Sequence, residues 1–373
     1  MKVLFGSDIS GEFGKGDKCM QLFTEKRTKE IFNDFLDVIK DADATVVNLE
    51  CAITDSDHKI AKYGPNLKMP ITTAEVLKDA GIDYVGLSNN HLYDFGRPGY
   101  YDTLRYLDAA GIKYTGVGEN LEDARKDMII TDGKIKIAVI AVCEHEFTFA
   151  LDNREGCREY DPYDTNDDIV EAKKNADFVV VMYHGGKEYS RYPSPRLVKA
   201  CRSMIKHGAD LVMCQHTHCI GCYEEFQGGH ILYGQGNFVF CEEDADEMWN
   251  TFLLVKAEFT DKVKVEFIPG NVVDGKAIEV SKGEMKEKLL RELFERSEAM
   301  KDGSWKQRWE EFCESMTGYK FIPENLRWRF AHNLTCEAHT DVLRYHYKTW
   351  NWTNELSEEQ TKENIEIRES LRR

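Results

Sequence analysis

The sequence lacks any apolar run long enough to cross a bilayer, and it carries no excess of positive charge. A spanning helix needs about 20 apolar residues, and no apolar segment of signal-peptide length stands at the N-terminus. The formal net charge of −17 argues against nucleic acid as the main partner, because nucleic-acid phosphates would be repelled. We therefore expect a cytoplasmic protein with no membrane span and no nucleic-acid partner.

Regularly spaced cysteines are also absent. The eleven cysteines are odd in number, which favours a reducing compartment in which most thiols are buried. Cys214, Cys219 and Cys222 follow part of a plant-type iron–sulfur spacing. Their fourth partner, Cys241, is distant, and histidines already occupy the same segment. Whether this group has a function stays open. A Walker phosphate loop and a nucleophile elbow are missing as well.

Apolar runs do alternate with segments of helical periodicity over the first part of the chain. We expect strands at 3–5, 44–49, 84–87, 135–142, 178–182 and 211–213, and helices within 25–40, 73–80, 98–110 and 196–207. The strand segments are continuously apolar, which predicts a largely parallel sheet covered on both faces. Shorter runs at 231–233, 252–259 and 263–268 predict antiparallel strands that complete the sheet.

The C-terminal part has a different character. From about residue 282 the chain is highly charged, with aromatic residues at helix-like intervals: Trp305, Trp309, Trp328, Tyr345 and Tyr347. A chain of 373 residues is longer than one core usually serves. We therefore expect a main α/β domain at 1–275 and a helical C-terminal extension at 276–373.

Polar side chains gather where the predicted strands end. They are Asp8, Asn48, Glu50, Asn90, His91, His184, His216 and His218. In open α/β sheets, ligands collect at the carboxyl ends of strands. His216 and His218 are expected on one side of an extended segment, since side chains two apart share a face. Taken one at a time, these residues also have structural explanations: Asp8 could cap a helix, and His184 could be a buried core histidine.

Together these residues form a set of carboxylate, amide and imidazole donors, which is typical of a metal site. The set is larger than one tetrahedral ion requires. Two ions sharing a bridging carboxylate are therefore favoured.

Six segments, in this order, resemble the CapA branch of the calcineurin-like metallophosphoesterases, the poly-γ-glutamate capsule biosynthesis family. They are "GSDIS" (6–10), "NLE" (48–50), "SNNHLYDFG" (88–96), "HGGKEY" (184–189), "GADLVMCQHTH" (208–218) and "YGQGNFVF" (233–240). The resemblance spans about residues 1–245. It implies a layered α/β/β/α metallophosphatase-like fold, to which the C-terminal extension is added.

The resemblance also implies roles for individual residues. Asp8 and His218 would hold one divalent ion. The other ion would be held by Asn90, His184 and His216. Glu50 would take the bridging position between the two ions, which would be manganese, iron or zinc.

His91 would then act on the substrate, and Asp94 would orient it. The candidate substrate-binding residues are Asn48, Arg97, Lys187 and Glu188. Arg97 and Lys187 fit equally well as ordinary surface residues.

The function that follows is a dinuclear hydrolase that acts on a small anionic or phosphorylated substrate. A phosphoester is the first candidate for that substrate. Two alternatives stay open. One is metal-dependent amide chemistry or an accessory role in poly-γ-glutamate synthesis, with capsule-synthesis partners. The other is a module that binds a metal or ligand without turnover.

Overall fold

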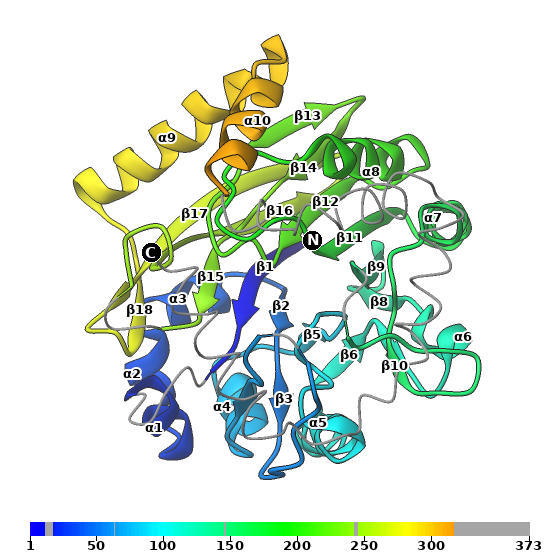
Figure 1. Ribbon diagram of the computed structural model, residues 1–373, viewed down its shortest axis with the longest axis vertical. Helices are drawn as coiled ribbons and strands as arrows, with labels where there is room; N and C mark the ends of the chain where they lie inside the picture. Colours follow the sequence, from blue (N-terminus) through cyan, green and yellow to red (C-terminus); the bar gives the residue numbers. More distant parts are fainter. Residues whose placement is uncertain (12–17, 63, 145–146, 242–244, 317–373) are drawn as a thin grey trace, which may run out of the picture.

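The computed structural model describes residues 1–11, 18–62, 64–144, 147–241 and 245–316 (Figure 1). Its strands are β1 (Lys2–Ile9), β2 (Ala44–Leu49), β3 (Ala52–Ile53), β4 (Lys68–Met69), β5 (Tyr84–Gly86), β6 (Lys113–Thr115), β7 (Val117–Gly118), β8 (Met128–Thr131), β9 (Lys136–Cys143), β10 (Gly156–Cys157), β11 (Phe178–His184), β12 (Leu211–Gln215), β13 (Tyr223–Phe226), β14 (Gly229–Leu232), β15 (Asn237–Val239), β16 (Thr251–Phe259), β17 (Val263–Val273) and β18 (Ala277–Val280). Its helices are α1 (Lys18–Thr24), α2 (Thr28–Phe32), α3 (Phe35–Lys40), α4 (Thr73–Asp79), α5 (Gly96–Ala110), α6 (Leu121–Ala124), α7 (Pro162–Asn175), α8 (Pro195–Lys206), α9 (Gly283–Asp302) and α10 (Trp305–Ser315).

Two sheets contain most of the strands (Figure 1). The larger sheet has the order β18-β17-β16-β1-β2-β5-β6, with β15 pairing beside the end of β1. Its strands β1, β2, β5 and β6 run parallel, whereas β16, β17 and β18 pair antiparallel. The smaller sheet has the order β13-β14-β12-β11-β9-β8 and is parallel except at its two edges.

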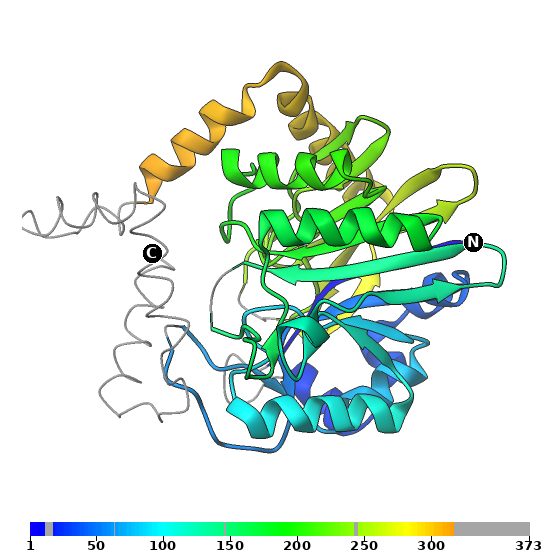
Figure 2. The ribbon, with the colours of Figure 1, turned by 90° about the vertical axis from the view of Figure 1, so that its right-hand side faces the viewer.

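The two sheets pack face to face around one apolar core. Val3 and Phe5 of β1 point into this core together with Val180 of β11. The alternate residue Leu4 lies in a second core, between the larger sheet and helices α1 to α5. Val181 lies in a third core, between the smaller sheet and helices α7 and α8. Figure 2 shows the green helices α7 and α8 on one side of the strands and the cyan helix α5 on the other. The predicted α/β/β/α layering is confirmed.

The strands expected in one largely parallel sheet are divided between two sheets, whereas the expectation that both faces are covered is confirmed. Each sheet has helices on one face and the other sheet on the opposite face. Either arrangement buries both faces of a strand, so the strand is continuously apolar in both cases. The run at 231–233 forms part of β14, which pairs antiparallel with β13, as expected, but parallel with β12.

The predicted helix within 25–40 is divided into α2 and α3. Asn33 separates them with a φ of 43°, a value outside the right-handed helical region. Its side-chain Nδ2 donates to the carbonyl of Ile278 at 3.0 Å, which ties the break to β18. A tertiary contact therefore fixes an interruption that the apolar spacing alone does not indicate.

The region predicted as a helical extension begins with the strand β18, and α9 and α10 follow it. Leu289 and Leu293 of α9 join the core between the sheets, and Trp305 of α10 joins the core beneath α8. The predicted boundary near residue 275 falls between β17 and β18, which pair with each other. Trp328, Tyr345 and Tyr347 lie outside the described residues.

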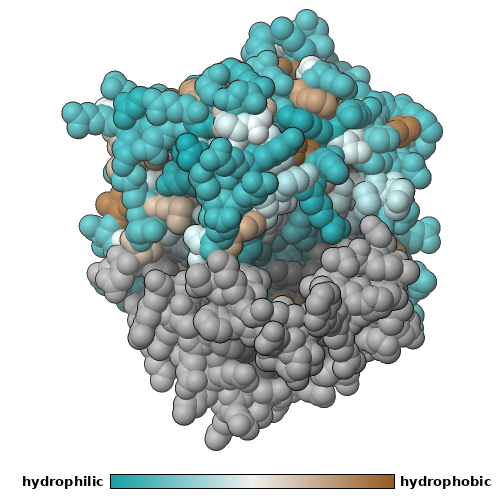
Figure 3. Space-filling model, turned by 45° about the horizontal axis from the view of Figure 1, so that its top comes forward, coloured by the Kyte–Doolittle hydropathy of each residue, from teal (hydrophilic) through white to brown (hydrophobic). Residues whose placement is uncertain are grey.

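Figure 3 shows the face of the molecule that is at the top of Figure 1. The described residues on this face are mostly hydrophilic, with scattered apolar residues among them. None of the helices in the described ranges is both long and apolar enough to span a bilayer.

Candidate metal centre

Strand ends from both sheets meet at one buried site. Asp8 lies near the end of β1 and Glu50 directly follows β2, and these two strands pair in parallel. His184 is the last residue of β11, and His216 follows β12 after Gln215. Because β11 and β12 also pair in parallel, the carboxylates come from one sheet and the imidazoles from the other.

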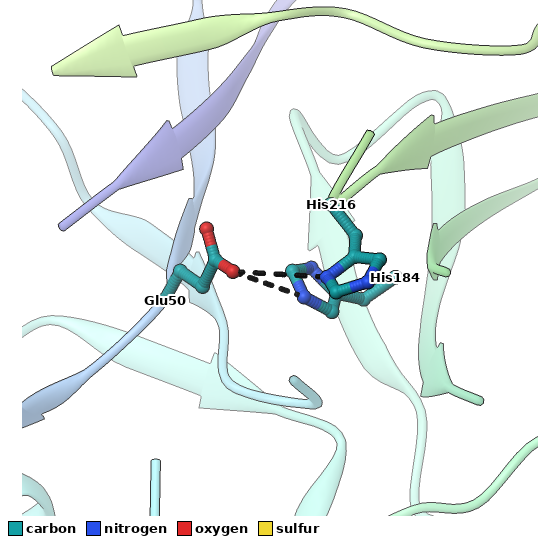
Figure 4. A group of neighbouring side chains, drawn as sticks. All are labelled: Glu50, His184 and His216. Atoms are coloured by element: carbon teal, nitrogen blue, oxygen red, sulfur yellow. Dashed lines mark ion pairs between the residues drawn. The ribbon is translucent and has the colours of Figure 1, made fainter. Parts of the chain in front are cut away.

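Glu50 faces the neighbouring rings of His184 and His216 (Figure 4). Its Oε1 is 3.3 Å from His184 Nε2 and 4.0 Å from His216 Nδ1, and its side chain is 0% exposed. Within the described ranges, neither carboxylate oxygen of Glu50 accepts a hydrogen bond of ordinary geometry. Burying a carboxylate without such partners is costly. A bound cation would remove that cost.

The metal-binding donors of the described chain form two groups, and Glu50 belongs to both. One group is Glu50, His184 and His216, and the other is Asp8, Glu50 and His218. In each group the donor atoms lie within 4.8 Å of one another. Asn90 adds an amide oxygen 2.9 Å from His184 Nε2. Oxygen and nitrogen donors around a shared carboxylate fit two divalent ions. The assignment of ligands to each ion stays a prediction.

Three residues at this site have unusual backbone angles. The φ values are 82° at His216, 53° at His218 and 64° at Tyr189. Such left-handed angles are uncommon outside glycine and cluster at functional sites. The expectation that His216 and His218 share one side of an extended segment was wrong, because both lie in the turn after β12. The turn instead places their ring centroids 5.9 Å apart.

Two asparagines orient the surrounding groups. Asn48 Nδ2 donates to Asp8 Oδ1 at 2.7 Å and lies 3.2 Å from His184 Nδ1. Asn237 Oδ1 lies 2.8 Å from His218 Nδ1. Asn48 was predicted to bind substrate, but its contacts with two candidate ligands favour an orienting role.

The electrostatics of the centre suit a cation. Burial raises the pKa of Asp8 well above its usual value, and the nearby charge of Glu50 raises it further. Burial acts on Glu50 in the same sense, but the histidines His184, His216 and His218 together outweigh it and hold the pKa of Glu50 well below its usual value. Burial lowers the pKa of His184 to about 4 and that of His218 in the same direction. Neutral imidazoles are the form that binds metal.

His91 and Asp94 lie beside the donor groups without belonging to either. His91 is 7% exposed, and its Nδ1 is 2.6 Å from Asp94 Oδ2. Lys62, which the sequence pattern did not indicate, places its Nζ 2.5 Å from Asp94 Oδ1. It lies in an irregular segment between β3 and β4, where no periodicity marks it.

The remaining predicted substrate residues lie at different places. Arg97 is 63% exposed and pairs with Glu155 at 2.8 Å, so the structure does not bring it to the donor groups. Lys187 and Glu188 form an ion pair, and Glu188 Oε1 is 3.7 Å from His216 Nε2. Although burial raises it, His216 and Lys187 together hold the pKa of Glu188 at about 2.

Residues near His218 were also missed. Its ring centroid lies 4.6 Å from that of Trp249 and 6.2 Å from that of Tyr189. Asn237 belongs to the "YGQGNFVF" segment, so the motif contained a usable signal. Trp249 lies outside every quoted motif, and only the fold brings it to the site.

The alternative iron–sulfur interpretation finds no support. The donor groups found in the described residues include no cysteine. Cys214, Cys219 and Cys222 are buried free thiols. Cys214 Sγ lies 3.6 Å from that of Cys201, which comes from α8.

Fold and site together define a layered α/β protein with candidate ligands for divalent metal ions. The model of the family described as bacterial capsule synthesis protein PGA_cap matches residues 4–242. The chain therefore belongs to this family. It is 26% identical over 333 residues to the capsule biosynthesis protein CapA of Bacillus anthracis, covering 86% of this chain and 79% of that protein.

Other similar proteins carry related names. The PGA biosynthesis protein CapA of Bacillus subtilis (strain 168) is 28% identical, with 78% of this chain and 79% of that protein covered. A probable polyglutamine synthesis accessory protein of Mycobacterium tuberculosis is 28% identical, with 53% of this chain and 55% of that protein covered.

Solved structures resemble the chain more distantly. A putative 5′-nucleotidase from Staphylococcus aureus in complex with alpha-ketoglutarate matches with a TM-score of 0.44 and 16% identity. The match covers 79% of this chain but 58% of the nucleotidase chain. A 5′-nucleotidase precursor from Thermus thermophilus matches with a TM-score of 0.40 and 13% identity, over 78% of this chain and 58% of that one. The family assignment rests on the sequence comparisons.

Proposed function

We propose that this protein is a dinuclear metal-dependent hydrolase whose substrate is a small phosphoester. The observation that carries the proposal is the environment of Glu50. This buried carboxylate accepts no ordinary hydrogen bond from the described residues, and two groups of donors share it. Manganese, iron and zinc are the ions that suit such mixed nitrogen and oxygen donors.

In this proposal Asp8 and His218 hold one ion, and His184 and His216 hold the other together with Asn90. Glu50 bridges the two positions. When bound, a pair of divalent ions supplies a water nucleophile at neutral pH and offsets the negative charge of the phosphoryl oxygens. Each ligand group combines carboxylates from one sheet with imidazoles from the other, so the spacing of the donors within a group depends on how the sheets pack.

His91 would act on the leaving group. Its Nδ1 is engaged by Asp94, so its Nε2 is the nitrogen that faces the substrate. As an imidazolium the ring gives its Nε2 proton to the departing oxygen, and it is left neutral with the remaining proton on Nδ1, held by Asp94. A positioned acid of this kind contributes ~10²–10⁴-fold to the rate.

Substrate binding would use the loop after β11. Lys187 lies beside Glu188, which in turn lies near His216, so its ammonium group is close to the proposed centre. The net charge of −17 repels anions at long range, and local positive charge is needed to hold them. Arg97 would act only at the periphery, because it is exposed and already paired with Glu155.

A second candidate is an accessory role in poly-γ-glutamate synthesis, with capsule-synthesis proteins as partners. The names of the similar proteins from Bacillus and Mycobacterium favour it. The same centre could then polarise an amide carbonyl of the polymer.

The test is hydrolysis of p-nitrophenyl phosphate by metal-free protein to which Mn²⁺ is added back. We expect turnover that chelation abolishes and that Glu50→Gln removes. Glu266→Gln, on the exposed edge of β17, is the matched control and should turn over normally. Metal binding without turnover of any phosphoester would contradict the phosphoesterase and favour the second candidate.

A further inference from the structure

Lys62 is a buried lysine that no motif of the sequence includes. Its side chain is 1% exposed, and its Nζ lies 2.5 Å from Oδ1 of Asp94, whose side chain is 0% exposed. Few lysines are buried to this degree without a specific charged partner. The ion pair joins the irregular segment between β3 and β4 to the turn that carries His91.

The two oxygens of Asp94 have separate partners. Oδ1 contacts Lys62, whereas Oδ2 lies 2.6 Å from His91 Nδ1 and accepts a hydrogen bond from the backbone N–H of Leu67 at 2.7 Å. Lys62 Nζ also donates to the carbonyl of Asn90 at 3.4 Å. With both oxygens engaged, the carboxylate cannot rotate, and Oδ2 stays directed at the imidazole.

The ammonium group also restricts how His91 can be protonated. Lys62 Nζ lies 3.1 Å from His91 Nδ1. An ammonium group only donates hydrogen bonds, while ionised Asp94 only accepts them. The arrangement in which His91 Nδ1–H donates to Asp94 Oδ2 agrees with the charges of all three side chains. It leaves His91 Nε2 as the nitrogen available to substrate.

The ion pair is not needed simply to attach the segment. The backbone N–H of Ile60 donates to the carbonyl of Asp94 at 3.0 Å, and Asn66 Nδ2 donates to the same carbonyl at 3.0 Å. These contacts anchor the segment on both sides of Lys62. The lysine side chain therefore has a task of its own.

We propose that Lys62 is a positioning residue that acts through Asp94 to fix the orientation and tautomer of His91. The part of this proposal that concerns turnover rests on the proposed hydrolase function. The part that concerns His91 itself does not. The two parts are tested separately.

The first arm is kinetic, with p-nitrophenyl phosphate and Mn²⁺. Lys62→Met should lower kcat by ~10–100-fold, the usual effect of removing an outer partner of an active group, with KM and metal content little changed. On an Asp94→Asn background the same substitution should lower kcat by less than ~3-fold, because residues that act through one another are not additive. Independent, additive losses would overturn the proposal.

A matched control is Lys68→Met. Lys68 follows the same segment, is 22% exposed and pairs with Asp57, away from His91. It should leave kcat unchanged. An equal loss of kcat in this variant would show that any damage to the segment lowers activity, and the specific role of Lys62 would be refuted.

The second arm is nitrogen NMR of protein labelled with ¹⁵N-histidine, with His91→Gln used to assign the signals. We expect one tautomer of His91 in the unsubstituted protein, with its proton on Nδ1, and a mixture in Lys62→Met. Unchanged His91 signals would overturn the proposal whatever the activity. If no hydrolysis is found at all, the proposed function fails while this arm still decides the role of Lys62.

Lys62→Met leaves Asp94 buried without its cation, so this chain could fail to fold. The double variant Lys62→Met/Asp94→Asn avoids that charge and is then compared with Asp94→Asn alone. A kcat within ~3-fold and equal His91 signals are expected. A larger loss in the double variant would contradict the proposal.

Discussion

The substitution His91→Asn separates chemistry from metal binding at this centre. His91 belongs to neither donor group of the described residues, so its removal should leave the metal content close to normal. Its ring is 7% exposed and is held by Asp94 at 2.6 Å, which is the geometry of a positioned acid. The expected loss in kcat is at least ~10²-fold, equivalent to ~2.7 kcal/mol of transition-state stabilisation.

The assay compares p-nitrophenyl phosphate with phenyl phosphate, whose leaving group departs less easily. His91→Asn should lose more activity on phenyl phosphate, because that leaving oxygen needs the proton more. Asp94→Asn should give a milder loss with a shifted pH profile, since the carboxylate sets the tautomer of the ring. If His91→Asn instead lost metal in proportion to activity, His91 would be a ligand and the reasoning would be refuted.

Three further predictions concern other parts of the molecule. A chain ending before α9 should keep its metal but melt at a lower temperature, because it loses Leu293, which is 0% exposed; complete unfolding would show that the main domain cannot fold without α9. Burial raises the pKa of Asp127 to about 6 despite the contact with Arg158, so the folded state holds the extra proton and the contribution of Asp127 to stability should fall as the pH rises from ~4 to ~6. Asp127→Asn should remove this contribution and change the dependence of stability on pH over that range in denaturant titrations, and an unchanged dependence would contradict it. Asn237→Ala should weaken the binding of one metal equivalent by ~10–100-fold, because Asn237 holds His218; calorimetry showing two unaltered sites would argue against it.

The long buried strands of the fold could be predicted because their cause is local, whereas short strands such as β6 and β13 were not predicted. Continuous apolar segments mark β2, β9, β11 and β12, and the polar residues that follow them mark the site. How the strands divide between two sheets could not be predicted, because a strand such as β11 is apolar on both faces whether a helix or a sheet covers it. That division depends on contacts between segments far apart in the chain.

The residues of the site were predictable to different degrees. Glu50 and His184 lie at the ends of two strands that the apolar runs predict, so their places could be inferred from the sequence. Lys62 could not be found, because it approaches His91 from an irregular segment 29 residues earlier in the chain. Trp249 reaches His218 by the same kind of long-range contact. Such residues become visible only when the fold brings their segments together.

The most direct test of the central claim is the metal content of the purified protein after loading with Mn²⁺ and removal of excess metal. The account predicts two equivalents per chain, and it predicts that Glu50→Gln weakens both sites together because one carboxylate serves both donor groups. A single equivalent in the unsubstituted protein, or two full equivalents retained by Glu50→Gln, would contradict the bridged centre.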